Sequence, residues 1–253
     1  MRKTKLFVAF CIFAFCVTAF LLKTKHLYFE NDVQVLSSFA HSEAANPNDV
    51  LLKATPHGGA EYLNKIVFLG DSRTYGLKAF SILDGGEKTT QVWTPRSGTM
   101  SIWDMQLQKI VFPESGNEIT SAEAAAIKKP EILIISLGLN GVEIVKKDYF
   151  ISEYVKLVNS IKNASPDTEI ILQSMFPVCR SYTLLNNPTI QEGNKWIMEV
   201  AKQTGSHYLN TAEVLVDEDG FLIEEYSTDG CHLTPLGLDV QIEYICTHTV
   251  GGS

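Results

Sequence analysis

Short apolar runs of strand length alternate along this chain with longer segments whose apolar residues recur every three or four positions. Strands are predicted at residues 66–69, 90–93, 132–137, 169–173 and 207–209. Helices are predicted at residues 73–83, 101–110, 122–128, 149–163, 190–204 and 235–247. Continuous apolar strands separated by helices indicate a parallel sheet that is covered on both faces. The predicted class is therefore α/β, with three layers.

The first residues have a different pattern. Residues 6–22 form an uncharged apolar run with basic residues on both sides, which is at the short end of what spans a bilayer. A cleavable signal peptide would use the small residues around Ala19, but an apolar stretch follows where a polar mature start is expected. We favour an uncleaved anchor, and the heavier basic count before the run weakly predicts a cytoplasmic N-terminus. Both interpretations export the remainder of the chain.

The pattern divides the chain into three parts. Residues 1–26 are the predicted signal anchor or transmembrane segment, 27–60 a polar stalk or linker with turn signals, and 61–253 a single globular domain. Part of the linker is expected to pack on the domain surface, because residues 33–36 and 50–52 are apolar. The predicted location is the cell membrane, single-pass with the domain outside, or secretion if the first segment is cleaved.

Composition narrows the function. The chain has 253 residues, of which 45% are hydrophobic, so it can bury a sizeable core. Its net charge of −8 argues against nucleic-acid binding, which needs a concentrated basic face that no segment of the sequence supplies. The six histidines form no close cluster with acidic residues apart from Asp229 and His232, so neither a metal site nor a cofactor is predicted.

The stretch 65–76, KIVFLGDSRTYG, contains the first candidate catalytic residue along the chain. A buried strand ends at Gly70 and a helix follows, so Ser72 lies at the carboxyl edge of the sheet, where ligands of open α/β sheets bind. Ser72 there could act as a nucleophile. The alternative is that Asp71 or Ser72 is only a helix N-cap.

Two distant segments supply partners for a serine. Asn140 follows the strand 132–137 and should reach the same edge of the sheet, although it could equally be a turn residue. Asp229 precedes His232 by three positions in one loop, so its carboxylate can fix the imidazole tautomer and leave Nε2 free to take a proton from serine. A surface histidine is the alternative for His232.

Taken together, these residues resemble the SGNH hydrolase superfamily, also called GDSL esterases and lipases, from residue 65 to the last helix. Gly70-Asp71-Ser72 is similar to its first block, Gly98 to the second, Gly138 with Asn140 to the third, and Asp229 with His232 to the last. The departures are Arg73, Arg96 and Gly141, at positions where the family commonly has an apolar residue, asparagine and aspartate.

The resemblance implies a flavodoxin-like sheet and a serine esterase. Ser72, His232 and Asp229 would form the catalytic triad, and an oxyanion hole would combine the backbone N–H groups of Ser72 and Gly98 with the Asn140 amide. The predicted substrate is a small acyl group, most plausibly acetyl, on carbohydrate. A polysaccharide O-acetyltransferase, a lysophospholipase or thioesterase, and an inactive glycan-binding module remain alternatives.

Two further expectations concern the surroundings of this site. Trp93, Trp103 and Tyr182 are expected near the catalytic edge, where they could stack on sugar rings or belong to the core. Cysteines 179, 231 and 246 lie in the exported part, and a disulfide between residues 179 and 231 would brace His232. Spacing alone does not fix the pairing, and reduced thiols are the alternative.

Overall fold

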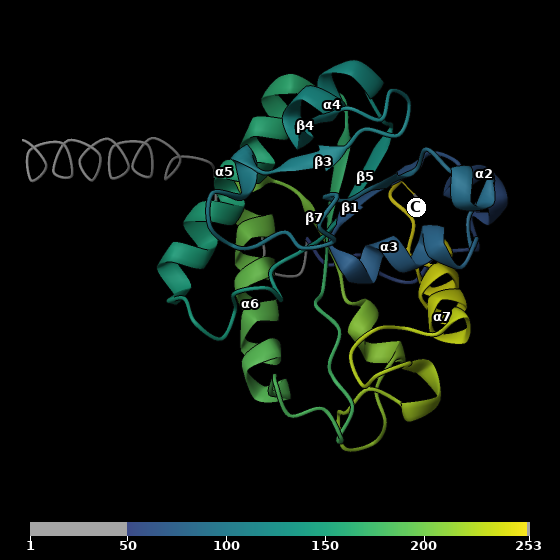
Figure 1. Ribbon diagram of the computed structural model, residues 1–253, viewed down its shortest axis with the longest axis vertical. Helices are drawn as coiled ribbons and strands as arrows, with labels where there is room; N and C mark the ends of the chain where they lie inside the picture. The colour runs from purple at the N-terminus through teal and green to yellow at the C-terminus, as the bar shows by residue number, and fades with distance from the viewer. Residues whose placement is uncertain (1–49, 252–253) are drawn as a thin grey trace, which may run out of the picture. The chain divides into compact units, whose positions relative to one another are not determined.

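A computed structural model describes residues 50–251 of the chain. Its central sheet has five parallel strands in the order β2-β1-β5-β6-β7 (Figure 1). These strands are β1 (Ile66–Gly70), β2 (Val92–Trp93), β5 (Ile132–Ser136), β6 (Glu169–Gln173) and β7 (His207–Leu209). Their positions confirm the predicted strands to within a few residues, because each is a short apolar run that is buried on both faces.

Alternate residues of each strand face opposite layers of the core. Val67 and Leu69 of β1 belong to the cluster packed under α4 (Ser121–Lys128), α5 (Lys147–Ala164) and α6 (Asn187–Thr204). Phe68 belongs to the other cluster, together with residues of α2 (Gly59–Leu63), α3 (Ser72–Ala79) and α7 (Pro235–Cys246). Figure 1 shows the two helical layers on either side of the sheet. The three-layer α/β class is confirmed.

Local signals in the sequence set several helix ends. The Asn186 side chain caps α6 by accepting the Thr189 N–H at 2.9 Å, and the helix closes at Gly205 in the left-handed conformation. Thr234 caps α7 with proline at its first position. Helix α3 ends at Ala79, earlier than the predicted residue 83, and Ser81 just beyond it has φ +56°.

The predicted helix at 101–110 is wrong. This segment contains a short 3-10 turn, η2 (Met105–Leu107), and then β3 (Lys109–Val111), which pairs antiparallel with β4 (Glu118–Thr120). Tertiary contacts override the helical pattern, because the buried Glu153 carboxylate accepts the Asp104 N–H at 2.9 Å and holds Asp104 at φ +50°. The Gln108 amide also bonds the Trp103 carbonyl at 2.6 Å.

Irregular segments complete the domain. Three further 3-10 turns are η1 (Gly86–Lys88), η3 (Thr211–Val214) and η4 (Glu224–Tyr226). The apolar stretch 50–52 runs parallel to β7, with the Leu52 N–H bonded to the Tyr208 carbonyl at 2.9 Å. The predicted anchor at 1–26 lies outside the described residues, and within 50–251 no helix has both the length and the apolarity to cross a membrane.

Candidate active site

Three segments meet at the carboxyl edge of the sheet. Strands β1 and β5 are neighbours, with Gly70 opposite Ser136, so the residues that follow them emerge side by side. The chain passes from β1 to β2 on one side and continues to β5 on the other, which makes this the switch point where open α/β sheets bind ligands. The loop before α7 supplies the third segment.

Ser72 is the first residue of α3, and Asp71 is its N-cap. The Asp71 carboxylate accepts the Arg73 N–H at 3.1 Å, so the capping role falls to Asp71 and the Ser72 hydroxyl is left free. Gly70 makes this close turn possible, because a Cβ at that position would collide with the Thr74 side chain. The hydroxyl of Ser72 instead meets His232.

A continuous chain of hydrogen bonds joins Ser72, His232 and Asp229. Ser72 Oγ lies 2.9 Å from His232 Nε2, and His232 Nδ1 lies 2.8 Å from Asp229 Oδ2. The other carboxylate oxygen of Asp229 accepts the backbone N–H groups of Cys231 and His232 at 2.9 and 2.8 Å. With Nδ1–H donated to Asp229, Nε2 is the acceptor that faces the serine. The structure therefore brings the three predicted residues together.

The environment of Asp229 keeps its carboxyl group ionised. Partial burial opposes ionisation, but the hydrogen bonds from the His232 N–H, the imidazole and the Cys231 N–H outweigh it and lower the pKa of Asp229 to about 2. An ionised carboxylate here fixes the imidazole orientation and stabilises an imidazolium when one forms.

Asn140 lies beside Ser72 and is oriented by Asp71. Its Nδ2 donates to Asp71 Oδ2 at 2.8 Å, which leaves its second amide N–H available. Positions 138 and 141, on either side of Asn140, are glycines because the structure has no space for a side chain at either position. A Cβ on Gly138 would lie 2.7 Å from the Phe150 ring, and one on Gly141 would lie 2.5 Å from Ile102.

Asp71 is almost fully buried beneath these groups. Burial raises the pKa of Asp71, while the Arg73 guanidinium, the Arg73 backbone N–H and His232 act in the opposite direction. The carboxyl group thus joins the start of α3 to the loop after β5 through two hydrogen bonds. Sequence analysis treated Asp71 as part of a motif and missed this contact with Asn140.

Gly98 is near Ser72, but its backbone N–H already donates a hydrogen bond within its own loop. A Cβ on Gly98 would lie 3.9 Å from the Ser72 Cβ, so the glycine is adjacent to the serine as predicted. Its N–H donates to the Pro95 carbonyl at 2.9 Å within a tight turn, and its φ is +75°. In this conformation Gly98 is therefore not available as an oxyanion donor, contrary to the expectation from the sequence.

Arg73 connects α3 to the loop that carries His232. Its buried guanidinium donates to the Phe176 carbonyl at 2.7 Å and to Cys231 Sγ at 3.2 Å, one residue before His232. Sequence analysis noted Arg73 only as a departure from the family pattern. No signal in the sequence connects it to Cys231, because the contact depends on how the last loop folds over α3.

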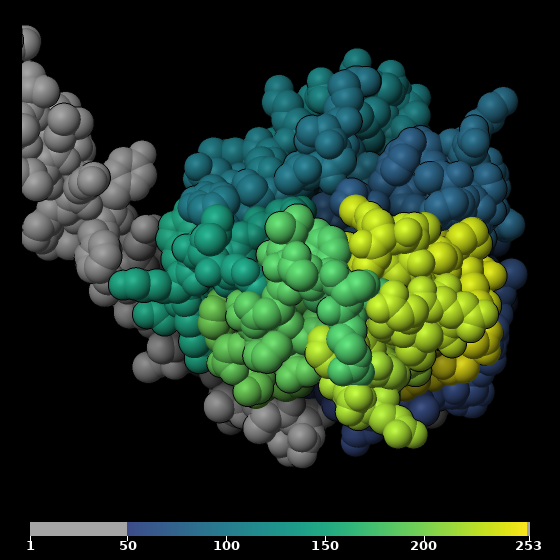
Figure 2. Space-filling model, turned by 60° about the horizontal axis from the view of Figure 1, so that its bottom comes forward, coloured from purple at the N-terminus to yellow at the C-terminus, as the bar shows by residue number. Residues whose placement is uncertain are grey.

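The proposed disulfide is absent, since cysteines 179, 231 and 246 are all free and buried. Cys179 and Cys231 belong to different clusters of the core, and the Cys231 thiol faces Arg73. A backbone bond braces the loop instead, from the Cys179 N–H to the Gly230 carbonyl at 2.8 Å. Figure 2 shows the two segments side by side, in green and yellow-green.

The predicted aromatic residues do not form one platform. Trp93 is fully buried against Phe112, so of the two alternatives left open by the sequence it belongs to the core and does not stack on sugars. Trp103 is 42% exposed, and a Cβ on Gly230 would lie 3.0 Å from the Tyr182 Cβ, beside the His232 loop. Tyr75, one helical turn after Ser72, is 48% exposed, and its spacing of three from Ser72 is the signal that sequence analysis overlooked.

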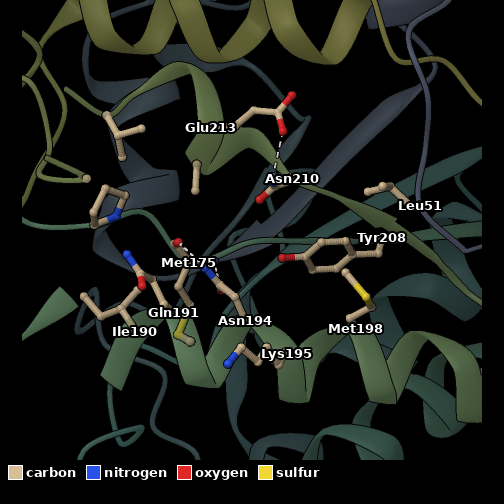
Figure 3. Close-up of a pocket in the computed structure, with 14 residues that line it drawn as sticks. Leu51, Met175, Ile190, Gln191, Asn194, Lys195, Met198, Tyr208, Asn210 and Glu213 are labelled. Atoms are coloured by element: carbon tan, nitrogen blue, oxygen red, sulfur yellow. Dashed lines mark hydrogen bonds between the residues drawn. The ribbon is translucent and has the colours of Figure 1, made fainter. Parts of the chain in front are cut away.

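Two concave regions lie near this edge of the sheet. A cavity of about 350 Å³ between α6 and the end of β7 is lined by residues that include Met175, Lys195, Met198 and Tyr208 (Figure 3). Its lining contains none of the Ser72–His232–Asp229 chain. A second region, of about 440 Å³, includes Gly98 and therefore adjoins Ser72. Within residues 50–251 no group of three or more His, Cys, Asp or Glu side chains could hold a metal ion.

The fold and this arrangement define a class: an α/β protein with a Ser–His–Asp hydrogen-bond chain at the switch point of a parallel sheet. A family model described as GDSL-like Lipase/Acylhydrolase family matches residues 68–240. The chain belongs to this family and is an ester-hydrolysing enzyme. No match is found among curated protein sequences.

Solved structures share the fold at low sequence identity. A protein assigned to the G-D-S-L lipolytic family from Desulfitobacterium hafniense is 21% identical, with a TM-score of 0.52 over 73% of this chain and 98% of that chain. The periplasmic domain of a lipopolysaccharide acetyltransferase from Salmonella ser. Paratyphi A is 19% identical, with a TM-score of 0.51 over 72% and 82% of the two chains. At these identities the likeness concerns the fold alone.

Proposed function

We propose that this enzyme removes small acyl groups, most readily acetyl, from carbohydrate hydroxyls through an acyl-serine intermediate. The observation that carries this proposal is the Ser72–His232–Asp229 hydrogen-bond chain, in which Ser72 Oγ and His232 Nε2 are 2.9 Å apart. A serine hydroxyl is a weak nucleophile until a base within hydrogen-bond reach takes its proton, and His232 meets that requirement.

The reaction follows from these positions. His232 Nε2 takes the proton of Ser72 as Oγ bonds to the ester carbonyl carbon, and Asp229 stabilises the resulting imidazolium. The C–O bond to the sugar then breaks, and His232 returns the proton to the leaving sugar oxygen. In the second half of the cycle His232 takes a proton from water as the water oxygen bonds to the acyl carbon. The bond from that carbon to Ser72 Oγ then breaks, His232 returns the proton to Oγ, and the carboxylic acid is released.

Two donors support the negative charge that develops on the carbonyl oxygen. The Ser72 N–H lies in the first turn of α3, where backbone donors have no partner within the helix. The Asn140 amide keeps one N–H free after its bond to Asp71. Gly98 would contribute only if its turn with Pro95 opened, and catalytic contacts that tighten when substrate binds are common.

The surroundings of Ser72 favour a small acyl group and water as the acceptor. The largely apolar cavity of Figure 3 is not lined by Ser72, and the region beside Gly98 mixes apolar side chains with the cations Lys78 and Arg96, so neither provides a continuous apolar channel that leads from Ser72. The side chains of His232 and Asp229 are 41% and 52% exposed, so water reaches the base. Because an acetyltransferase domain shares the fold, the fold itself does not separate hydrolysis from transfer.

The test offers the full chain three substrate sets: 4-nitrophenyl esters of increasing acyl length, an acetylated oligosaccharide, and an acetyl donor with a glycan acceptor. Release of acetate from the oligosaccharide, with ester turnover that falls as the acyl chain lengthens, is the expected result. Preference for long chains would overturn the proposal in favour of a lipase. Product that forms only when the acceptor sugar is present would overturn it in favour of a transferase.

The same proposal includes attachment to a membrane with the enzyme domain outside. It is supported by the uncharged run at residues 6–22 and the basic residues on both sides of it. We expect the full chain to sediment with membranes, to resist a carbonate wash, and to lose its domain when intact cells are treated with protease. Recovery of the full-length chain in the cytosol would contradict this part of the proposal.

A further inference from the structure

The concave region of about 440 Å³ next to Ser72 is a groove between α3 and the loop that follows β2. Tyr75 and Lys78 of α3 line one wall, and Thr94, Arg96 and Ser97 line the other. Gly98 lies at its end, where a Cβ would be 3.9 Å from the Ser72 Cβ. None of the Ser72–His232–Asp229 chain lines the groove, but Gly98 joins the groove to Ser72, so a substrate whose ester reaches Ser72 can extend its alcohol portion into the groove.

Helix α3 sets the direction of the groove. Ser72, Tyr75 and Lys78 are spaced by three residues, so each is a neighbour of the next on the helix surface, and the row turns gradually around α3. A rise of 1.5 Å per residue places Lys78 roughly 9 Å further along the helix axis than Ser72. The backbone of Lys78 is thus set back from Ser72 along α3, and its long side chain, which tilts toward the start of the helix, can reach a group next to the reacting sugar.

The groove has the opposite charge to the chain as a whole. Its lining includes two cations, Lys78 and Arg96, and no carboxylate, although the chain carries a net charge of −8. Among residues 50–251 no ion pair is found for Lys78, and Arg96 has only a long, exposed contact of 3.4 Å from Nε to Glu118. Cations grouped in a cleft attract anions locally even when the whole protein is acidic.

The remaining lining suits a sugar. Tyr75 presents a half-exposed ring and Ser97 an exposed hydroxyl group, while Val92, Pro95 and Val111 add apolar surface for the face of a sugar ring. On the basis of the proposed esterase function, we propose that this groove binds an acidic glycan, in which the unit next to the acylated sugar carries a carboxylate or a phosphate. Lys78 and Arg96 recognise the anion, and Tyr75 stacks on the sugar between the anion and Ser72.

The experiment compares kcat/KM of the full chain on matched acetylated oligosaccharides: neutral, carrying glucuronate, and carrying phosphate. The variants are Lys78→Met, Arg96→Gln and the double variant. Lys195→Met serves as the control, since Lys195 is an exposed lysine that lines the separate cavity of Figure 3. The two anionic substrates distinguish a carboxylate from a phosphate as the preferred group.

The unmodified chain should prefer an anionic substrate, with a preference that falls as salt screens the charges. Each single substitution should lower that preference by roughly twofold to fivefold, mainly through KM, which is the range for exposed charge pairs. The Lys195→Met control should keep the full preference. Equal kcat/KM on neutral and anionic substrates, or a preference that survives the double substitution, would overturn the proposal.

A binding measurement separates this proposal from the esterase function. The deacetylated acidic oligosaccharides are titrated into the full chain by calorimetry, which needs no turnover. If the chain hydrolyses no ester but binds the acidic oligosaccharide through Lys78 and Arg96, the esterase proposal fails and the groove stands. If it hydrolyses acetyl esters but binds neutral and acidic oligosaccharides equally, only the groove proposal fails.

Discussion

The Asp71 carboxylate holds two groups in place, the first turn of α3 and the side-chain amide of Asn140. One carboxylate oxygen caps α3 through the Arg73 N–H, and the other accepts the Asn140 amide at 2.8 Å. Because Asp71 is 3% exposed, both bonds are shielded from water and restrict the Asn140 side chain to one orientation. The free amide hydrogen of Asn140 is thereby fixed before substrate arrives, which is the condition for efficient stabilisation of an oxyanion.

Replacement of Asn140 by alanine removes that donor. We expect Asn140→Ala to lower kcat by roughly 10²- to 10³-fold with little change in KM, because the charge it stabilises appears only in the tetrahedral intermediate. Steady-state kinetics on an aryl acetate measures both constants, and thermal unfolding checks that the loss of Asp71's partner has not unfolded the domain. A change confined to KM would contradict the assigned role.

Replacement of Asp229 by asparagine tests the orientation of His232. The Cys231 and His232 N–H groups hold the amide oxygen, so the amide NH2 faces Nδ1 and can only donate to it. The tautomer in which an unprotonated Nε2 accepts from Ser72 is then no longer favoured. The expected loss in kcat is roughly 10³- to 10⁴-fold. Activity within threefold of the unmodified enzyme would show that Asp229 does not position the imidazole.

The sequence reveals some of these residues better than others. Asp229 and His232 are three positions apart in one loop, so their contact is local and could be predicted. Arg73 and Cys231 are far apart in the sequence, and nothing in their types indicates that they touch. The N–H of Gly98 is engaged by the Pro95 carbonyl, a property of backbone angles that a single glycine in a sequence does not reveal.

At the scale of elements, the loop from β5 to α5 is held in shape by two glycines with positive φ. Gly141 has φ +147°, and its missing side chain leaves room for Ile102, whose N–H bonds the Asn140 carbonyl at 3.1 Å. The loop after β2 therefore packs directly on the residue that carries the proposed oxyanion donor. Disturbing one loop should displace the other.

The substitution Gly141→Ala should destabilise the domain by about 3 kcal/mol, because an unfavourable φ is combined with a contact of 2.5 Å to Ile102. Gly116→Ala is the matched control, since its φ is also positive, at +72°, but no atom lies within 4 Å of the new Cβ. It should cost only about 1 kcal/mol. Urea unfolding measures both, and equal losses would show that packing against Ile102 is unimportant.

The side chain of Arg73 joins two elements, so its removal should loosen the His232 loop. We expect Arg73→Met to lower kcat by roughly tenfold while KM changes little, since the loop no longer has its contacts with α3 and Phe176. Arg73→Lys should recover part of the rate by restoring one donor. If both variants lower stability but leave kcat unchanged, Arg73 is structural only.

Elements could be predicted where local pattern and tertiary packing agree. The strand 169–173 has three consecutive apolar residues at its middle and lies between β5 and β7, and its predicted bounds are those of β6. The segment 101–110 has a helical pattern, but Glu153 on α5 binds its backbone and β4 pairs with its end. Those partners are distant in sequence, so pattern alone could not reveal them.

At the scale of the whole molecule, acid should unfold the enzyme through carboxylates that are hydrogen-bonded when folded. Asp229, Asp217, Glu123 and Glu192 all have lowered pKa values, and for Asp217 the main cause is the Phe221 backbone N–H. Each such group stabilises the fold above its unfolded pKa, near 4, and the contribution is lost as pH falls through the folded pKa. Asp71, with a raised pKa, acts in the opposite direction.

Among these carboxylates, the contribution of Asp229 to stability can be tested, because its pKa in the folded enzyme is about 2 and so lies well below the unfolded value. The urea midpoints of the unmodified enzyme and of Asp229→Asn should differ most above pH 5 and converge as pH falls toward 2. The difference should be modest, because the carboxylate is half exposed and partly screened by water. A difference that is constant with pH would contradict ionic stabilisation by Asp229.

The three-layer architecture could be predicted from the alternation of strands and helices, because each apolar strand must be covered on both faces. The groove of two cations beside Ser72 could not, since it combines one face of α3 with a loop whose path depends on packing. A net charge of −8 excludes a basic surface of large extent but says nothing about a local pair of cations.

The most direct test of the central claim is the activity of Ser72→Ala. We measure kcat/KM on 4-nitrophenyl acetate for the unmodified full chain, for Ser72→Ala, and for Ser115→Ala, which changes an exposed serine in the turn between β3 and β4. If Ser72 is the nucleophile, the first substitution lowers kcat/KM by at least roughly 10³-fold, and the second leaves most of the activity. Turnover by Ser72→Ala within a few-fold of the unmodified enzyme would contradict the account.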